Sequence, residues 1–112
     1  MMHGPPSKAD WKKFEAILPE LRERYLKKKN PEIGEMLTNE ANSPTENFWA
    51  TAERIRKESR ILHDCLDGYT KAQMKERILI MYHAGMFLEG DIQHFSRELQ
   101  EEFLEHIKKW KK

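Results

Sequence analysis

Apolar residues recur at helical spacing along most of the chain, and the first such segment spans residues 8–29. Its apolar positions are three or four residues apart, which places them on one face of an α-helix: Trp11, Phe14, Leu18, Leu21 and Tyr25. Pro19 interrupts this segment, because proline lacks a backbone donor and clashes with the preceding turn. Since the apolar line keeps its phase across Pro19, we expect a kinked helix. After Asn30-Pro31 we expect a short connector helix at residues 31–37.

The clearest helix start in the chain lies at Ser43. This residue is a good N-cap, Pro44 suits the first helical position, and Glu46 completes a capping box. The helix that follows, residues 44–66, carries an apolar line expected to form its packed seam: Phe48, Ala52, Ile55, Ser59, Leu62 and Leu66, with Trp49 beside it. Gly68 then favours a helix end and a tight turn. We therefore expect this helix and the next to form an antiparallel hairpin.

A third helix, predicted for residues 71–89, is apolar around its circumference. Two apolar lines lie on nearly opposite sides of it: Met74, Ile78, Met81, Gly85 and Leu88 on one, and Ile80, Ala84 and Phe87 on the other. A helix that is apolar all round is buried on all sides, and so short a chain offers few covering helices. We therefore expect a second chain to cover the second line, the alternative being complete cover by the other helices of the same chain. A close helix crossing would explain Gly85 in mid-helix.

A fourth helix begins after Asp91, which can cap it. Its apolar face reads Ile92, Phe95, Leu99, Phe103, Ile107 and Trp110. No segment shows the alternation of a strand. The fold class predicted is all-α, a small antiparallel bundle of four main helices. It forms a single domain over residues 7–112, preceded by a flexible tail at residues 1–6.

Composition and charge narrow the functional classes. Charged residues make up 35% of the 112 residues, against about 25% in an average domain, which suits helices with solvated outer faces. The formal net charge of +1 gives no overall field that favours nucleic acid or an anionic membrane. The longest apolar run, residues 78–88, is too short to cross a bilayer, which needs about 20 apolar residues. A single cysteine and no apolar leader fit a cytoplasmic protein.

Candidate chemistry is sparse. Histidine and carboxylate pairs four residues apart occur three times, but no Glu-x-x-His motif of a di-iron bundle is present. Cys65 has only His63 nearby, and residues two apart on a helix point to different sides. No glycine-rich phosphate loop and no nucleophile motif occur. We therefore predict no metal, no cofactor and no catalytic residues.

Two arginine and histidine pairs leave an alternative open. Arg77 with His83, and Arg56 with His63, resemble the Arg-x(4–6)-His motif of the small all-helical HEPN ribonucleases. The resemblance covers two residues in each case, and Arg77 is followed by Ile78 where that family usually has a polar residue. It implies RNA cleavage by the paired side chains. Basic residues of the second and third helices would then contact nucleic acid.

The pattern favours a non-enzymatic helical module for protein–protein interaction. Its partner is expected to be a second copy of the chain, another protein, or both, with nucleic-acid binding or HEPN-like cleavage as the alternative. The expected partner-binding residues are the second apolar line of the third helix and two tryptophans at its rim: Ile80, Ala84, Phe87, Trp49 and Trp110. Aromatic residues are chosen because they dominate the energetics of interfaces.

Overall fold

The computed structural model describes residues 4–111, and every regular element in that range is helical. The long helices are α1 (Lys8–Leu37) and α2 (Pro44–Leu66), followed by α3 (Met74–His83) and α4 (Arg97–Trp110). Two 3-10 helices, η1 (Lys71–Gln73) and η2 (Glu89–His94), connect them. The predicted all-α class is confirmed. Among these residues, no helix is both long enough and apolar enough to cross a membrane. Of the expected flexible tail, residues 1–3 lie outside the described range, and Pro6 is buried.

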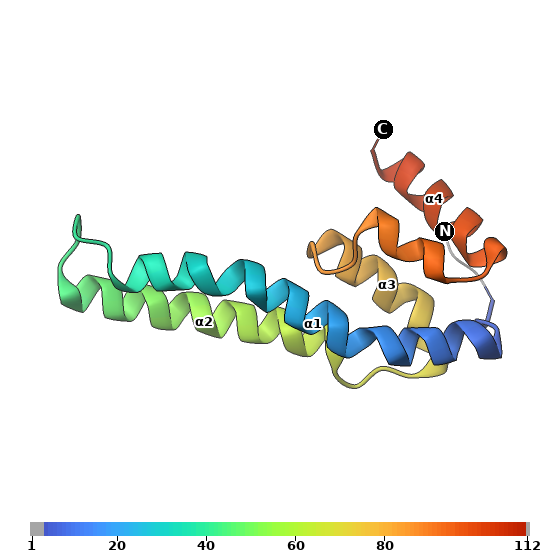
Figure 1. Cartoon of the computed structure of the whole chain (residues 1–112), viewed down its shortest axis with the longest axis horizontal. Helices are drawn as coiled ribbons and strands as arrows, with labels where there is room; N and C mark the ends of the chain where they lie inside the picture. The colour runs from blue at the N-terminus through green and yellow to red at the C-terminus, as the bar shows by residue number, and fades with distance from the viewer. Residues whose placement is uncertain (1–3, 112) are drawn as a thin grey trace.

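The molecule consists of a long helical hairpin with a compact head at one end (Figure 1). Helices α1 and α2 lie side by side and run in opposite directions, joined by residues 38–43. Helices α3 and α4 pack beside the first half of α1, and the far half of the hairpin projects beyond them. This projecting part, residues 26–62, is called the arm below. The extents of 52 × 30 × 18 Å reflect this elongated shape.

Helix α1 passes through both of its prolines without interruption. Continuity at Pro19 agrees with the unbroken phase of the apolar line. The prediction that the first helix ends at Lys29 is wrong. The separate connector helix at residues 31–37 is wrong too, because these residues form the last turns of α1. Pro31 removes one backbone hydrogen bond, but packing of α1 along α2 on both sides of it keeps the helix intact.

The predicted start of α2 is confirmed atom by atom. The Ser43 hydroxyl accepts from the Glu46 amide at 3.1 Å, and the Ser43 amide donates to the Glu46 carboxylate at 3.0 Å. This capping box satisfies two backbone donors that a helix start would otherwise leave open. At the other end, Gly68 adopts a φ of +65°, which turns the chain toward η1.

Helix α3 is shorter than predicted, and the correction has a local cause. It ends at His83, because Gly85 adopts a φ of +82°. The Met86 amide donates to the Met81 carbonyl at 2.8 Å, and the Gly85 amide donates to the Tyr82 carbonyl at 3.1 Å. This is the Schellman pattern of a helix end. The expected helix crossing at Gly85 is wrong, because a side chain placed there would meet no atom within 4 Å.

The predicted cap of the fourth helix is also corrected. Ser96 caps α4, and Asp91 instead lies within η2, where it accepts from the Leu88 amide at 2.7 Å. Ser96 additionally donates through its amide and its hydroxyl to Asp10 of α1, at 2.8 and 2.6 Å. The buried Asp10 carboxylate thus ties the start of α1 to the start of α4.

The hydrophobic core sits where the head meets the first half of the hairpin. Its fully buried members come from α1, α2, α3, α4 and the segment after α3: Phe14, Leu21, Cys65, Met74, Ile78, Met81, Met86, Phe87, Leu99 and Phe103. Of the arm, the near end of α2 packs against this core through the partly buried Ile61 and Leu62, and the rest extends away from it.

Candidate interaction surface

The two helices of the arm meet through a polar network. The Tyr25 hydroxyl donates to Glu58 at 2.5 Å, and the Arg54 guanidinium donates to the other oxygen of Glu58 at 2.8 Å. Arg54 also donates to Glu32 of α1 at 2.8 Å. Burial alone would raise the pKa of Glu58, but the hydrogen bonds from Tyr25 and Arg54 outweigh it and hold that pKa below its ordinary value. The carboxylate is therefore ionised at neutral pH.

The side of α2 that faces α1 is accordingly polar along most of its length. Its buried residues share one helical line: Asn47, Thr51, Glu58 and Cys65. The apolar line predicted as the seam of this helix lies about a quarter turn away, at roughly 100° per residue. The prediction of that line as an internal seam is wrong over the arm, because Phe48 and Ile55 remain 57% and 48% exposed.

Large apolar side chains are therefore exposed along α2. Trp49 is 64% exposed and packs edge-on against Phe48, with ring centroids 4.9 Å apart. Two neighbouring aromatic rings at the surface are costly to hydrate, and such patches mark interaction sites more often than single exposed residues do.

Helix α1 adds a second apolar line to the arm. Leu26 and Ile33 are partly buried, and Leu37 is 51% exposed. These residues lie about a quarter turn from the α1 positions that contact α2. Because the two helices are antiparallel, the lines of α1 and α2 turn toward the same face of the hairpin.

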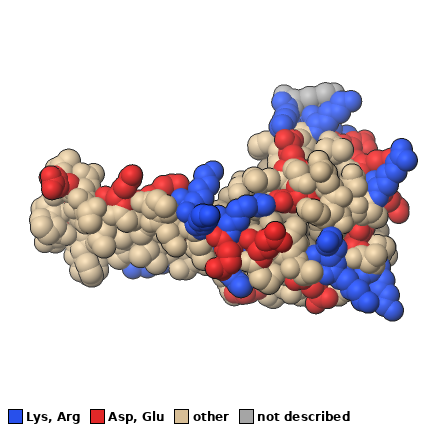
Figure 2. All heavy atoms as spheres, viewed as in Figure 1, with Lys and Arg blue, Asp and Glu red and all other residues tan. Residues whose placement is uncertain are grey.

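We call this surface the hairpin face. It comprises the apolar residues of both arm helices that lie on that side: Leu26, Ile33, Leu37, Phe48, Ala52, Ile55 and Leu62. Figure 2 shows the arm with few charged side chains on the viewed side, the charges lying mostly along its edges and toward the head. The signal in the sequence was the spacing of Leu26, Ile33 and Leu37, which the placement of a separate connector helix obscured.

The head attaches to the opposite side of α1. Arg24 lies about 160° around the helix from Leu26. Its guanidinium donates to both oxygens of Asp91, at 2.9 and 2.6 Å, and to the Met86 carbonyl at 3.0 Å. Since the head is fixed on this side, it leaves the hairpin face open.

The five predicted partner-binding residues do not form one surface. Trp49 lies on the arm, beside the hairpin face, whereas Ile80 and Trp110 are 46% and 59% exposed on the head. Ala84 is partly buried at the end of α3. Phe87 is fully buried within the single chain. The expectation that Phe87 anchors a partner is therefore corrected, because α3 ends before it and the chain turns its ring into the core.

The histidine in the predicted apolar run has a partner within the head. The Nε2 atoms of His83 and His106 lie 3.3 Å apart, and the Trp110 ring packs 4.7 Å from the His83 ring. Burial, and then the nearby His83, lower the pKa of His106. Among the described residues, no three potential metal ligands gather in one place.

The basic residues that would contact nucleic acid in the alternative function form hydrogen bonds and ion pairs within the chain. Arg77 donates to the backbone carbonyl of Asp64, not toward His83. Arg56 pairs with Glu53, and Lys75 lies 2.8 Å from Glu102. These contacts place carboxylates or backbone oxygens on several cations of the expected basic surface.

Two remaining features offer little for chemistry. Cys65 is buried, and desolvation raises the pKa of its thiol to about 11, so the nucleophilic thiolate is scarce at neutral pH.

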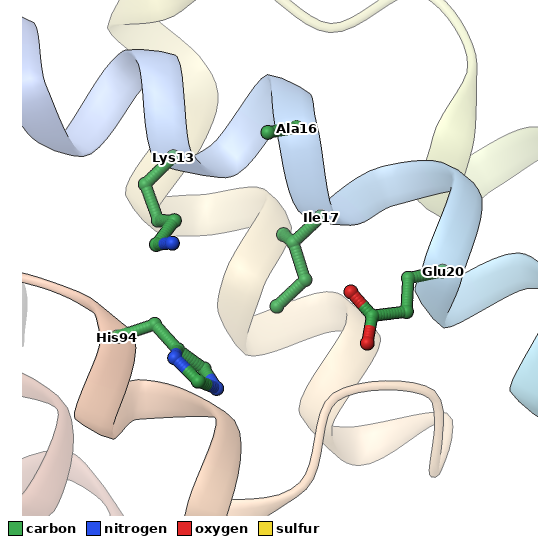
Figure 3. A pocket seen from close by; sticks show the side chains of 5 residues that line it. All are labelled: Lys13, Ala16, Ile17, Glu20 and His94. Carbon is green, nitrogen blue, oxygen red and sulfur yellow. The ribbon is translucent and has the colours of Figure 1, made fainter.

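A groove between α1 and η2 holds about 120 Å³ and is lined by Lys13, Ala16, Ile17, Glu20 and His94 (Figure 3). Ligand pockets are usually about 300–1,000 Å³.

Comparisons with known proteins find no relative of this chain. No protein-family model, no curated protein and no solved structure matches this chain.

Proposed function

We propose that the protein is a non-enzymatic interaction module that associates with a second copy of itself through the hairpin face. One observation supports this above the others: apolar side chains from two antiparallel helices share an open surface on a projecting arm. Covering Phe48, Ile55 and Leu37 would remove apolar area from water, at about 25 cal/mol per Å². The aromatic residues supply the large rigid contacts that dominate interface energetics.

We propose a second copy of the chain as the partner that buries the hairpin face. Most soluble oligomers are two-fold dimers in which the same patch is used on both subunits. Two helical hairpins packed by their apolar faces make a four-helix bundle, a stable arrangement for amphipathic helices. The buried free thiol of Cys65 suits a reducing compartment, and we place the dimer in the cytoplasm.

The size of the face sets the expected strength. Phe48 to Leu62 extend about 21 Å along α2, and two adjacent helices are about 20 Å wide. The flat footprint is therefore roughly 400 Å² per copy, or about 800 Å² in total, which is below the range of stable specific interfaces and typical of weak, transient ones. The dimer should be reversible and concentration-dependent, with a dissociation constant of micromolar order.

Matched substitutions of two isoleucines test this function. Ile55 on the hairpin face and Ile80 on the head are 48% and 46% exposed. Ile55→Glu buries an unpaired charge in the proposed dimer and should leave a monomer. Ile80→Glu should retain the wild-type mass, since its site stays in water. Light scattering coupled to size exclusion measures both, and far-UV circular dichroism checks that each variant is folded.

The same pair of variants can reject the proposal. A wild-type protein that remains at 13.4 kDa at hundreds of micromolar would exclude self-association. A dimer that survives Ile55→Glu but dissociates with Ile80→Glu would move the interface to the head, as the sequence pattern first indicated.

A further inference from the structure

Three consecutive lysines, Lys27, Lys28 and Lys29, lie in the middle of α1. Cations are favoured in the last turn of a helix, where the negative end of its dipole lies. Helix α1 continues to Leu37, about two turns past Lys29, so this stabilisation does not reach them. Neighbouring like charges also repel one another. The position of these lysines is therefore not explained by the helix alone.

Two of the three lysines line a pocket where the arm meets the head. The pocket lies between α1 and the turn that follows α3, and it holds about 150 Å³. Arg24 also lines it, but the guanidinium is bound to both oxygens of Asp91. The lining combines three cations of α1 with small or apolar residues of the turn: Arg24, Lys28, Lys29, Ala84, Gly85 and Leu88. A ligand there would meet cations on one side and a largely apolar wall on the other.

The two lysines of the pocket carry charge that the chain does not fully balance. The Lys29 ammonium lies 5.4 Å from the centre of the Tyr25 ring, and Lys28 is exposed. Both charges act on the Glu32 carboxylate one turn further along α1, but Arg54 already donates to that carboxylate at 2.8 Å. The two ammonium groups are therefore available to an anion that enters the pocket.

We propose that this pocket binds a small phosphate monoester, with the phosphoryl group on Lys28 and Lys29 and the organic substituent against Leu88. A phosphate monoester carries about −1.5 to −2 charges at pH 7, so one group can accept from both lysines. Lysine binds phosphate as a point charge. The volume of about 150 Å³ suits a phosphoryl group with a short substituent, because drug-sized ligands occupy about 300–1,000 Å³.

A small ligand is favoured over a nucleic acid. The formal net charge of +1 gives no overall field that would attract a polyanion. Binding in the pocket is also independent of self-association, because Lys28 lies about 160° around α1 from Leu26 of the hairpin face. A ligand on Lys28 therefore leaves that face open, and the monomer and the dimer should bind it equally well.

Matched lysine variants distinguish the pocket from general surface charge. Lys28→Gln removes a charge that lines the pocket, whereas Lys27→Gln removes its neighbour about 100° away around α1. Phenyl phosphate titrated at low ionic strength should shift the amide NMR signals of Gly85 and Leu88, with a dissociation constant of millimolar order. Lys28→Gln should raise this constant about tenfold. Lys27→Gln should leave it unchanged, and circular dichroism checks the fold of both variants.

Inorganic phosphate tests the apolar wall. It should shift the same two signals more weakly than phenyl phosphate, because it makes no contact with Leu88. Equal affinity for both probes would overturn the assignment of a monoester. Signals of Gly85 and Leu88 that do not shift with either probe would overturn the pocket itself.

A single-stranded DNA oligonucleotide provides the remaining comparison. If it binds more tightly than phenyl phosphate, and if Lys27→Gln and Lys28→Gln weaken it equally, the lysines form a diffuse nucleic-acid surface and the pocket is overturned. A wild type that binds phenyl phosphate and never dimerises would support the pocket and remove the proposed function. A wild type that dimerises without binding either phosphate probe would do the reverse.

Discussion

Gly85 ends α3 in a backbone conformation that residues with a side chain adopt only at a cost. Its φ of +82° lies in the left-handed region, and no atom lies within 4 Å of the position of an added Cβ. The cost of Gly85→Ala is therefore backbone strain without a clash, about 1–2 kcal/mol. Gly90→Ala is the matched control, because Gly90 also has open space and lacks a positive φ. Thermal unfolding should show a loss of roughly 4–8 °C for Gly85→Ala alone, whereas equal losses in both variants would contradict the role of the turn.

Residue chemistry in the sequence predicted some of these local features. Ser43 and Glu46 carry their own hydrogen-bonding partners within one turn, so the start of α2 followed from the residues alone. The end of α3 at Gly85 could not be predicted in the same way. The apolar residues around Gly85 continue the helical spacing past the point where the chain turns. A glycine inside an apolar run fits a helix crossing and a helix end equally well until the φ angle is known.

At the scale of elements, the contact between α1 and α2 depends on an ionised carboxylate. Hydrogen bonds from Tyr25 and Arg54 hold the pKa of Glu58 below its ordinary value of about 4.3. A lowered folded-state pKa adds stability above that ordinary value, and this stability is lost as the pH falls through the folded-state pKa. Glu58→Gln should cost about 1–3 kcal/mol at pH 7, and the gap between variant and wild type should narrow below about pH 4.

Urea unfolding at pH 7 and at pH 3 measures that gap. Glu105→Gln, an exposed carboxylate on α4, is the control and should match the wild type at both pH values. Burial raises the pKa of Asp91, but the hydrogen bonds from Arg24 and the Leu88 amide outweigh it and lower that pKa, so this contact should also lose stability in acid. The Glu58 account fails if the difference between Glu58→Gln and wild type is the same at both pH values.

The periodicity of apolar residues predicted that α2 is a helix, but it could not predict which face of α2 packs against α1. The bounds of α2 match the expected residues 44–66, and its apolar line was identified as one face. The spacing does not say what that face meets, and the structure packs the polar line of Glu58 against α1 instead. Hydrogen bonds between residues 33 positions apart, such as Tyr25 to Glu58, leave no periodic signal.

At the scale of the whole molecule, the helices of the predicted all-α bundle are arranged as a head and a projecting arm, 52 Å long in all. The apolar pattern of the sequence predicts self-association because residues 71–89 carry more apolar surface than so short a chain can cover, and it places the excess on the line of Ile80, Ala84 and Phe87. The single chain buries Phe87 through the turn at Gly85, so the excess moves to the arm. Of the predicted anchors, only Trp49 lies next to the hairpin face. Sequence alone could not place this face, because it joins α1 and α2 residues whose shared side depends on the antiparallel hairpin.

A dilution series of the isoleucine methyl NMR spectrum tests the central claim most directly. Isoleucines occur on the hairpin face at Ile33 and Ile55, on the exposed head at Ile80 and in the core at Ile78. Dimerisation through the hairpin face predicts that the methyl signals of Ile33 and Ile55 shift with concentration, while those of Ile80 and Ile78 stay fixed. Shifts at Ile80 with none at Ile33 and Ile55, or a spectrum that does not change at any concentration, would contradict the account.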